Sequence, residues 1–270
     1  MYKLLLTDLD GTLINNNGEL PPVNIQYIKK IMNKGINVAL CSGRSFVSLA
    51  RFEKEIGLNI PGCYGVCFNG GIVYNAHTKE ILKETRLNLQ TTLDILKEIK
   101  TAMGNNPVGI GLYLAGKFYV ENPSEEITWY ANKSGIEYIQ VDHFAQINQD
   151  ITKILLKGNN EHLKVIANHL INIINGKGVA FFSTPNIFEI IPLNSGKEQG
   201  LAFLSQKLNI PTTQIIAVGD QENDLKMIQM AGLGIAVANA ITDVKKVAKY
   251  ITKADNNQGV MKEIAEKFFL

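Results

Sequence analysis

The chain has 270 residues, of which 46% are hydrophobic and 19% are charged. This length allows one large domain or two modest ones, and the composition excludes both a disordered chain and a small disulfide-stapled protein. Its 27 basic and 25 acidic residues are spread along the sequence without a block of Lys or Arg, so we expect no nucleic-acid or anionic-membrane partner.

The first third of the chain alternates short apolar runs with amphipathic stretches, which is the pattern of a parallel sheet built from βα units. A sharp turn at Asn69-Gly70-Gly71 then leads into another short apolar run, 72–74. The expected strands are 3–8, 36–41 and 63–68, and the expected helices are 22–34 and 45–56.

From about residue 84 the pattern changes to longer polar helices separated by hairpin-like strands, which is typical of an α+β domain. The βα rhythm resumes after the apolar run 187–191. The predicted fold is therefore α/β, a Rossmann-like doubly wound parallel-sheet core of residues 1–83 and 187–270 with an inserted α+β cap of residues 84–186. In the insert we expect helices over about 90–103, 123–133 and 160–174 and strands over 111–120 and 151–157; after it, helices from Lys197 and Glu222 and strands over 214–218 and 233–237.

The cysteines and the N-terminal residues indicate in which cellular compartment the protein is expected. The first apolar run is only four residues long, which predicts neither a signal peptide nor a membrane-spanning helix. Cys41, Cys63 and Cys67 are an odd set in a long chain, so we expect a reduced, cytoplasmic protein. The Cys63–Cys67 spacing could nominally bind zinc, but no second pair of ligands stands nearby, and buried strand thiols are the favoured interpretation.

One segment resembles a nucleotide-binding loop. Residues 111–117 read Gly-Leu-Tyr-Leu-Ala-Gly-Lys, which nearly matches a Walker motif. Phe118 replaces the Ser or Thr that would hold Mg²⁺, and the flanking residues have the pattern of strands. We therefore predict a β-hairpin here.

Two acidic residues follow the first predicted strand in the segment Asp8-Leu9-Asp10-Gly11-Thr12. Ligands of open α/β sheets bind beyond the carboxyl ends of the strands, so this position suits catalysis. Acids two residues apart point the same way in an extended chain, and two close carboxylates repel each other unless a cation lies between them. Mg²⁺ is the expected cation. The alternative is an ordinary Asp-Gly turn with solvated acids.

Three further segments follow other predicted strands or begin helices. Ser42-Gly43-Arg44 offers a hydroxyl and backbone N–H groups to a phosphoryl oxygen, or else a helix cap. Arg44 forms either a salt bridge or a phosphate contact. Lys197 could neutralise a phosphate or be an ordinary surface lysine. The acids of 219–224 could belong to the same site or could cap a helix N-terminus.

Together and in this order, the four segments resemble the haloacid dehalogenase-like superfamily of aspartate-nucleophile phosphatases, and most closely its Cof-type sugar-phosphatase-like subgroup. The similarity extends to Phe68-Asn69-Gly70-Gly71, 194–200, 231–240 and 250–260, and it covers essentially both core segments. The insert matches only in size and position. The resemblance implies that this insert is a cap that sets substrate specificity.

The resemblance also implies roles for individual residues. Asp8 is the nucleophile and Asp10 the general acid and base. The metal binds a carboxylate oxygen of Asp8, the main-chain carbonyl of Asp10, and Asp220. The remaining site residues that it implies are Asn223 and Asp224 around the metal, and Ser42, Gly43, Lys197, Asn69 and Arg44 around the phosphate.

The function expected from this resemblance is Mg²⁺-dependent hydrolysis of a small phosphorylated metabolite, sugar phosphate-like, through an aspartyl-phosphate. A phosphomutase of the same superfamily is the nearest alternative, since the motifs alone do not separate transfer to substrate from transfer to water. A phosphoaspartate receiver-type signalling module also uses clustered acids, a Ser or Thr and a Lys. It carries its phosphorylated Asp later in the chain and needs less than half this length. The sequence names neither the substrate nor the oligomeric state.

Overall fold

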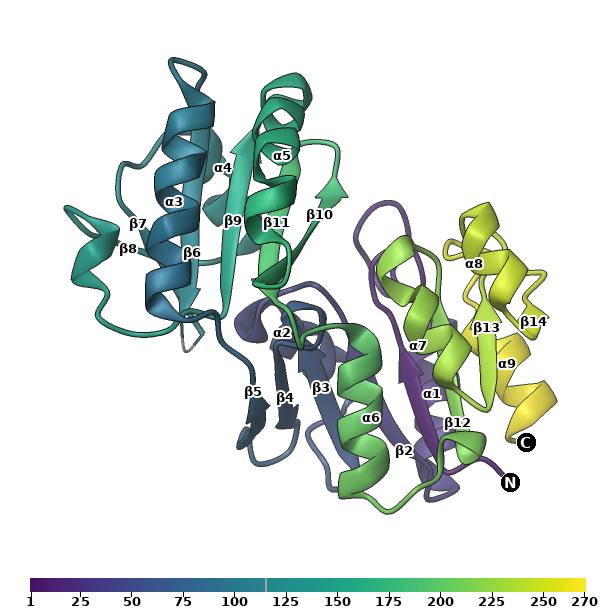
Figure 1. Cartoon of the computed structure of the whole chain (residues 1–270). Helices are drawn as coiled ribbons and strands as arrows, with labels where there is room; N and C mark the ends of the chain where they lie inside the picture. The colour runs from purple at the N-terminus through teal and green to yellow at the C-terminus, as the bar shows by residue number, and fades with distance from the viewer. Residues whose placement is uncertain (115) are drawn as a thin grey trace. The chain divides into compact units, whose positions relative to one another are not determined.

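The computed structural model describes residues 1–114 and 116–270, which divide into two compact units (Figure 1). The first unit comprises Met1–Lys83 and Gly196–Leu270, and the second comprises Glu84–Ser195. Each unit has its own sheet. The second unit is thus an insertion in the chain of the first.

The sheet of the first unit is mostly parallel and has β1 at its centre. Parallel pairs join β1 to both β12 and β2, with Leu4 opposite Ile215 on one side and Asn37 on the other. The four residues of β1 are apolar or Thr and all are buried, as expected for a strand covered on both faces. From β14 across the sheet to β3, every neighbouring pair of strands is parallel. The next strand, β4, is antiparallel to β3. The strand order is β14 (Tyr250–Ile251), β13 (Leu233–Ala236), β12 (Ile215–Gly219), β1 (Leu4–Thr7), β2 (Asn37–Cys41), β3 (Cys63–Cys67), β4 (Ile72–Asn75) and β5 (Ile81–Glu84).

Helices cover both faces of this sheet (Figure 1). On one face, α6 (Lys197–Lys207) and α7 (Leu225–Met230) pack on side chains of β1, β2 and β12 through Leu201, Leu204 and Met227. On the other lie α1 (Pro22–Asn33), α2 (Phe46–Ile56) and α9 (Met261–Phe268), while α8 (Thr242–Val247) packs beside α7 and β13. This arrangement confirms the predicted doubly wound α/β core. None of the described helices is long and apolar enough to cross a membrane.

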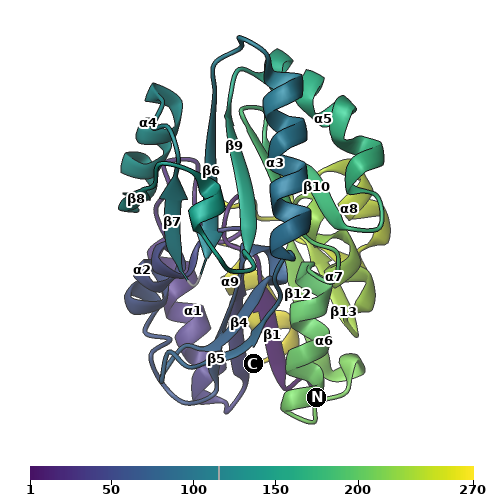
Figure 2. The same ribbon diagram turned by 60° about the vertical axis from the view of Figure 1, so that its left-hand side comes forward.

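The second unit is a mixed sheet with helices on both faces (Figure 2). Its pairs are antiparallel except for β7 with β8. The amphipathic helices α3 (Leu89–Met103) and α5 (Asn160–Ile174) bury their apolar stripes on one face, and α4 (Glu125–Ser134) contacts β6 and β9. This confirms the inserted α+β unit. The strand order is β10 (Gly178–Thr184), β11 (Ile187–Pro192), β9 (Lys153–Gly158), β6 (Val108–Leu114), β7 (Lys117–Val120) and β8 (Tyr138–Gln140).

The Walker-like segment forms the predicted hairpin. Antiparallel pairing of β6 with β7 places Gly111 opposite Val120 and Leu114 opposite Lys117. Ala115, which belongs to the same predicted hairpin, lies outside the described residues. The flanking strand pattern was therefore a better guide here than the spacing of the glycines.

The structure places the second boundary between the units later than the sequence pattern does. The apolar run at 187–191, which sequence analysis assigned to the core, forms β11 and pairs with β9 and β10 in the second sheet. Ile190, for example, stands opposite both Ile154 and Ala180. The chain enters the first unit again at Gly196. A buried strand has the same apolar pattern in either sheet, so only its partners decide where it belongs.

All three cysteines are buried, as the strand interpretation predicts. Burial raises the pKa of the Cys63 thiol to about 11 and also raises the pKa of Cys41. Since the thiolate is the reactive form, we expect the folded protein to resist a thiol-specific disulfide reagent at pH 8. In denaturant all three cysteines should react. The measurement is the absorbance of the group that the reagent releases when it reacts with a thiol. A rapid rise of this absorbance with the native protein would contradict the expectation.

Candidate active site

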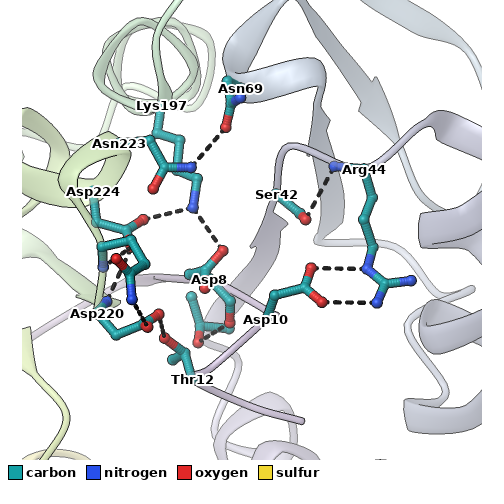
Figure 3. A network of polar contacts seen from close by, with 12 residues as sticks. Asp8, Asp10, Thr12, Ser42, Arg44, Asn69, Lys197, Asp220, Asn223 and Asp224 are labelled. Carbon is teal, nitrogen blue, oxygen red and sulfur yellow. Dashed lines mark hydrogen bonds and ion pairs between the residues drawn. The ribbon is translucent and has the colours of Figure 1, made fainter. Parts of the chain in front are cut away.

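Polar side chains from separate segments gather beyond the carboxyl ends of the central strands of the first unit (Figure 3). Asp8 directly follows β1, Ser42 follows β2, and Asp220 follows β12. Parallel strands end at the same edge of a sheet, so residues far apart in the sequence meet there. The structure thereby brings the predicted acids of two segments into one cluster.

Three buried aspartates form this cluster. The exposed fractions of Asp8, Asp220 and Asp224 are 4%, 2% and 0%, and one carboxylate oxygen from each lies within 4.8 Å of the others. Gly11 makes the approach of the two loops possible, because it has a φ of +77° and a Cβ atom there would stand 2.5 Å from Asp220 Oδ2. Any other residue at position 11 would displace Asp220.

Lys197 is the positive charge of the cluster. It is the first residue of α6, its Nζ lies 2.6 Å from Asp8 Oδ1 and 2.6 Å from Asp224 Oδ1, and it is 1% exposed. Burial by itself would lower the pKa of Lys197, but the carboxylates of Asp224 and Asp8 raise it above its ordinary value. The ammonium group therefore stays charged, and Lys197 is not a surface lysine.

One lysine does not balance three acids. Burial raises the pKa of Asp8 well above its usual range, with Lys197 opposing and Asp224 adding to the shift. Burial and the Asp224 carboxylate likewise raise the pKa of Asp220. The raised values show that negative charge accumulates here at a cost in free energy. A set of carboxylate oxygens in such a site could hold a hard metal ion, which would relieve the repulsion.

Hydrogen bonds orient the two acids of the loop after β12. Thr12 Oγ1 donates to Asp220 Oδ1 at 2.9 Å, and Gln221 Nε2 donates to Asp220 Oδ2 at 3.1 Å. Asp224 Oδ2 accepts the backbone N–H groups of Asp220 and Gln221 at 3.0 and 3.1 Å. Asp224 thus caps the short helical turn Glu222–Asp224 and also binds Lys197.

The sequence patterns pointed to neither Thr12 nor Gln221 as a site residue. The signal for Gln221 was its spacing of three residues from Asp224, which is the spacing of a capping box. Thr12 stood next to the Asp-Gly turn, but nothing in the sequence showed that its hydroxyl would reach a residue 208 positions later. Both hold Asp220 in one orientation.

Asp10 points away from the buried cluster and towards Arg44 (Figure 3). Arg44 Nε donates to Asp10 Oδ2 at 2.8 Å, and Arg44 Nη2 donates to Asp10 Oδ1 at 2.7 Å. The Asp10 side chain is 51% exposed. The salt bridge that the sequence left open for Arg44 is therefore formed. An exposed pair of this kind stabilises by about 1 kcal/mol or less, so either partner can leave it at little cost.

Ser42 lies in the loop between β2 and α2. It is 1% exposed, and its Oγ accepts the backbone N–H of Arg44 at 3.2 Å. The cap of α2 is Ser45, whose side chain accepts the backbone N–H of Ser48. Ser42 is thus not the helix cap, and its hydroxyl proton is available for another acceptor.

A hydrogen bond between Asn69 and Asn223 connects the turn after β3 to the loop after β12. Asn223 Nδ2 donates to Asn69 Oδ1 at 2.9 Å. Asn69 is 2% exposed, and its Nδ2 has no partner among the described residues. Gly43 lies against this amide, because a Cβ atom at position 43 would stand 3.1 Å from Asn69 Nδ2. A buried donor without an acceptor fits a site for an anionic group.

Comparisons with known proteins identify the family of the chain. The model of the haloacid dehalogenase-like hydrolase family matches residues 5–264. YxeH of Bacillus subtilis (strain 168) is 30% identical, with 98% of each chain covered. The 5-amino-6-(5-phospho-D-ribitylamino)uracil phosphatase YitU of the same organism is 25% identical over 99% of this chain and 98% of its own.

A solved structure shows the same fold. The crystal structure of a haloacid dehalogenase-like hydrolase from Bacteroides thetaiotaomicron superposes with a TM-score of 0.88 at 30% identity, covering 99% of this chain and 100% of that chain. Both units are thus shared, and the resemblance drawn from the four segments is confirmed. The chain belongs to the haloacid dehalogenase-like hydrolases, as a Cof-type phosphatase that acts on phosphoric monoesters.

Proposed function

We propose that this phosphatase hydrolyses a small phosphorylated metabolite, sugar phosphate-like, with Mg²⁺ as its cofactor and an aspartyl-phosphate on Asp8 as its intermediate. The observation that carries the proposal is the buried Asp8 carboxylate, with one oxygen 2.6 Å from Lys197 and inside the aspartate cluster. A relative whose name specifies a phosphorylated ribitylamino-uracil supports a substrate of this size.

The metal would be held by carboxylate oxygens of Asp8 and Asp220 and by the main-chain carbonyl of Asp10, with Asn223 and Asp224 beside it. When bound, Mg²⁺ would offset the charge of the aspartates and of the phosphoryl group. Asp8 would then attack phosphorus with its second oxygen, forming the O–P bond as the bond from phosphorus to the leaving oxygen breaks.

The phosphoryl oxygens require donors, and three segments offer them. Lys197 supplies a fixed positive charge, and the Ser42 hydroxyl and the Gly43 backbone N–H supply hydrogen bonds. The Nδ2 of Asn69, for which the described residues offer no acceptor, is a further donor. Arg44 could exchange its exposed pair with Asp10 for a phosphate contact.

Asp10 would act as the general acid and base. Its carboxyl group lies outside the buried cluster, so it can meet the leaving oxygen or a water. It would donate a proton to the leaving alkoxide in the first step. It would then take a proton from the water that attacks the phosphorus of phospho-Asp8, which releases inorganic phosphate and restores Asp8.

A panel of sugar and nucleoside monophosphates, assayed with and without Mg²⁺, tests the proposal. We expect Mg²⁺-dependent release of inorganic phosphate from at least one phosphorylated sugar or polyol, with a generic aryl phosphate as a weaker substrate. Rearranged sugar phosphate without phosphate release would instead indicate a phosphomutase. Failure to turn over any monoester in Mg²⁺ would refute the proposed function.

The insert is proposed to set specificity. We expect that replacing Glu84–Ser195 with a short linker will lower turnover of the best metabolite by a larger factor than turnover of an aryl phosphate, because a small substrate needs fewer contacts. The measurement is the kcat/KM of the shortened chain divided by that of the wild type, taken once for the metabolite and once for the aryl phosphate. Calorimetry on the shortened chain serves as the folding control, and an equal loss for both substrates from a folded protein would contradict the specificity role.

A further inference from the structure

The turn between β3 and β4 contacts two other segments of the candidate site through its backbone. It comprises Phe68–Gly70, and its backbone donates hydrogen bonds from Phe68 N to Arg44 O and from Asn69 N to Ser42 O, both at 3.0 Å. Gly70 lies against the carbonyl of Gly196, directly before Lys197, so closely that a Cβ atom would overlap it. The turn therefore joins the Ser42 loop to the start of α6.

This turn has an uncommon backbone. Phe68 and Asn69 both have a φ of 52°, in the left-handed region. Asn adopts that conformation readily, whereas a bulky residue such as Phe does so only when surrounding contacts impose it. Strained backbone of this kind occurs at sites where side-chain placement matters. In this turn, the left-handed backbone sets the position of the Asn69 side chain.

Asn69 also determines how the Asn223 amide faces. Because Asn223 Nδ2 donates to Asn69 Oδ1 at 2.9 Å, the Asn223 oxygen is turned away from Asn69 (Figure 3). Without that acceptor, the amide would be free to turn its NH₂ end towards the negative charge of the aspartate cluster. A carbonyl oxygen is a suitable ligand for a divalent cation or for its water, whereas an NH₂ group is not.

We propose that Asn69 is a positioning residue that acts through Asn223: its Oδ1 holds the Asn223 amide with the oxygen available to the metal site and ties the loop after β12 to the turn after β3. This role rests on the proposed metal dependence. It differs from a phosphate contact by Asn69, because it uses the oxygen of the amide and not its Nδ2.

The test is a double-mutant cycle of Asn69→Gly and Asn223→Ala, read by calorimetric titration with MgCl₂ and by kcat/KM for an aryl phosphate. Gly fits the left-handed backbone, so the turn is kept. We expect each single variant to bind Mg²⁺ about tenfold more weakly and the double variant to be within about threefold of Asn223→Ala. A double variant weakened further than that, or an Asn69→Gly protein that binds Mg²⁺ like wild type, would overturn the proposal.

Two controls complete the design. Asn209→Gly makes the same change at an exposed residue that also has a positive φ of 54°, and it should leave both readouts unchanged. Asn69→Asp keeps the acceptor oxygen but removes Nδ2, so Mg²⁺ binding should not weaken; weakening would make Nδ2 the operative group and overturn the proposal. A wild-type protein without Mg²⁺ binding would refute the metal dependence itself, before any variant is compared.

Discussion

Asp8→Asn is expected to lower kcat by about three orders of magnitude or more while the protein stays folded. The substitution keeps the volume of the side chain but removes the nucleophilic oxygen and one of the three clustered negative charges. Folding should not suffer, because burial and the neighbouring acids already disfavour the charged form of Asp8, as its raised pKa shows. Lys197 keeps its ion pair with Asp224.

Phosphate release from an aryl phosphate measures the loss, and calorimetry measures the stability. We expect a Tm within about 3 °C of wild type, or above it. Lys197→Met is the informative comparison: it leaves Asp8 and Asp224 buried without a cation and should lower the Tm as well as kcat. If Asp8→Asn retained a tenth of the wild-type turnover, a covalent mechanism on Asp8 would be excluded.

Removing divalent metal is expected to abolish turnover, and Mg²⁺ should restore it. The buried carboxylates repel one another, and a cation that neutralises them binds the folded state but not the dispersed residues of the unfolded chain. Mg²⁺ at a hundredfold excess over its Kd should therefore raise the free energy of unfolding by about 2.7 kcal/mol. Ca²⁺, with a larger and looser coordination sphere, should bind and inhibit.

Asp220→Ala provides the matched variant for this experiment. It removes a carboxylate that Thr12 and Gln221 hold in place, and it should raise the Mg²⁺ concentration needed for half-maximal activity steeply while reducing the Mg²⁺-induced rise in Tm. Asp243→Ala removes an exposed aspartate of α8 and should change neither. Full activity of the chelated wild-type enzyme would show that the reaction needs no metal.

Local patterns were sufficient for most of the elements that carry the site. The apolar run of β1, the Pro at the start of α1 and the lysine that opens α6 each predict an element that the structure confirms. The strands β5, β8, β10 and β14 and the helices α8 and α9 were not predicted. Four of these, β5, β8, β14 and α8, have only two to six residues, and segments of that length show too little periodicity. The orientation of the Asn69 and Asn223 amides could not be predicted either, because it depends on a hydrogen bond between residues that are 154 positions apart.

The amino-acid sequence by itself determined the class of the protein: βα periodicity specifies a parallel sheet, and the acids and lysine that follow its strands lie where such sheets bind ligands. Only the tertiary structure decided that Lys197 is buried between Asp8 and Asp224, that Asp10 pairs with Arg44, and that 187–195 belongs to the second unit. The physical reason is the same in each case. A strand or a charged side chain specifies the kind of partner it needs. Which partner it meets is decided when the sheets bring together segments that are far apart in the sequence, such as Asp8 and Lys197, which are 189 residues apart.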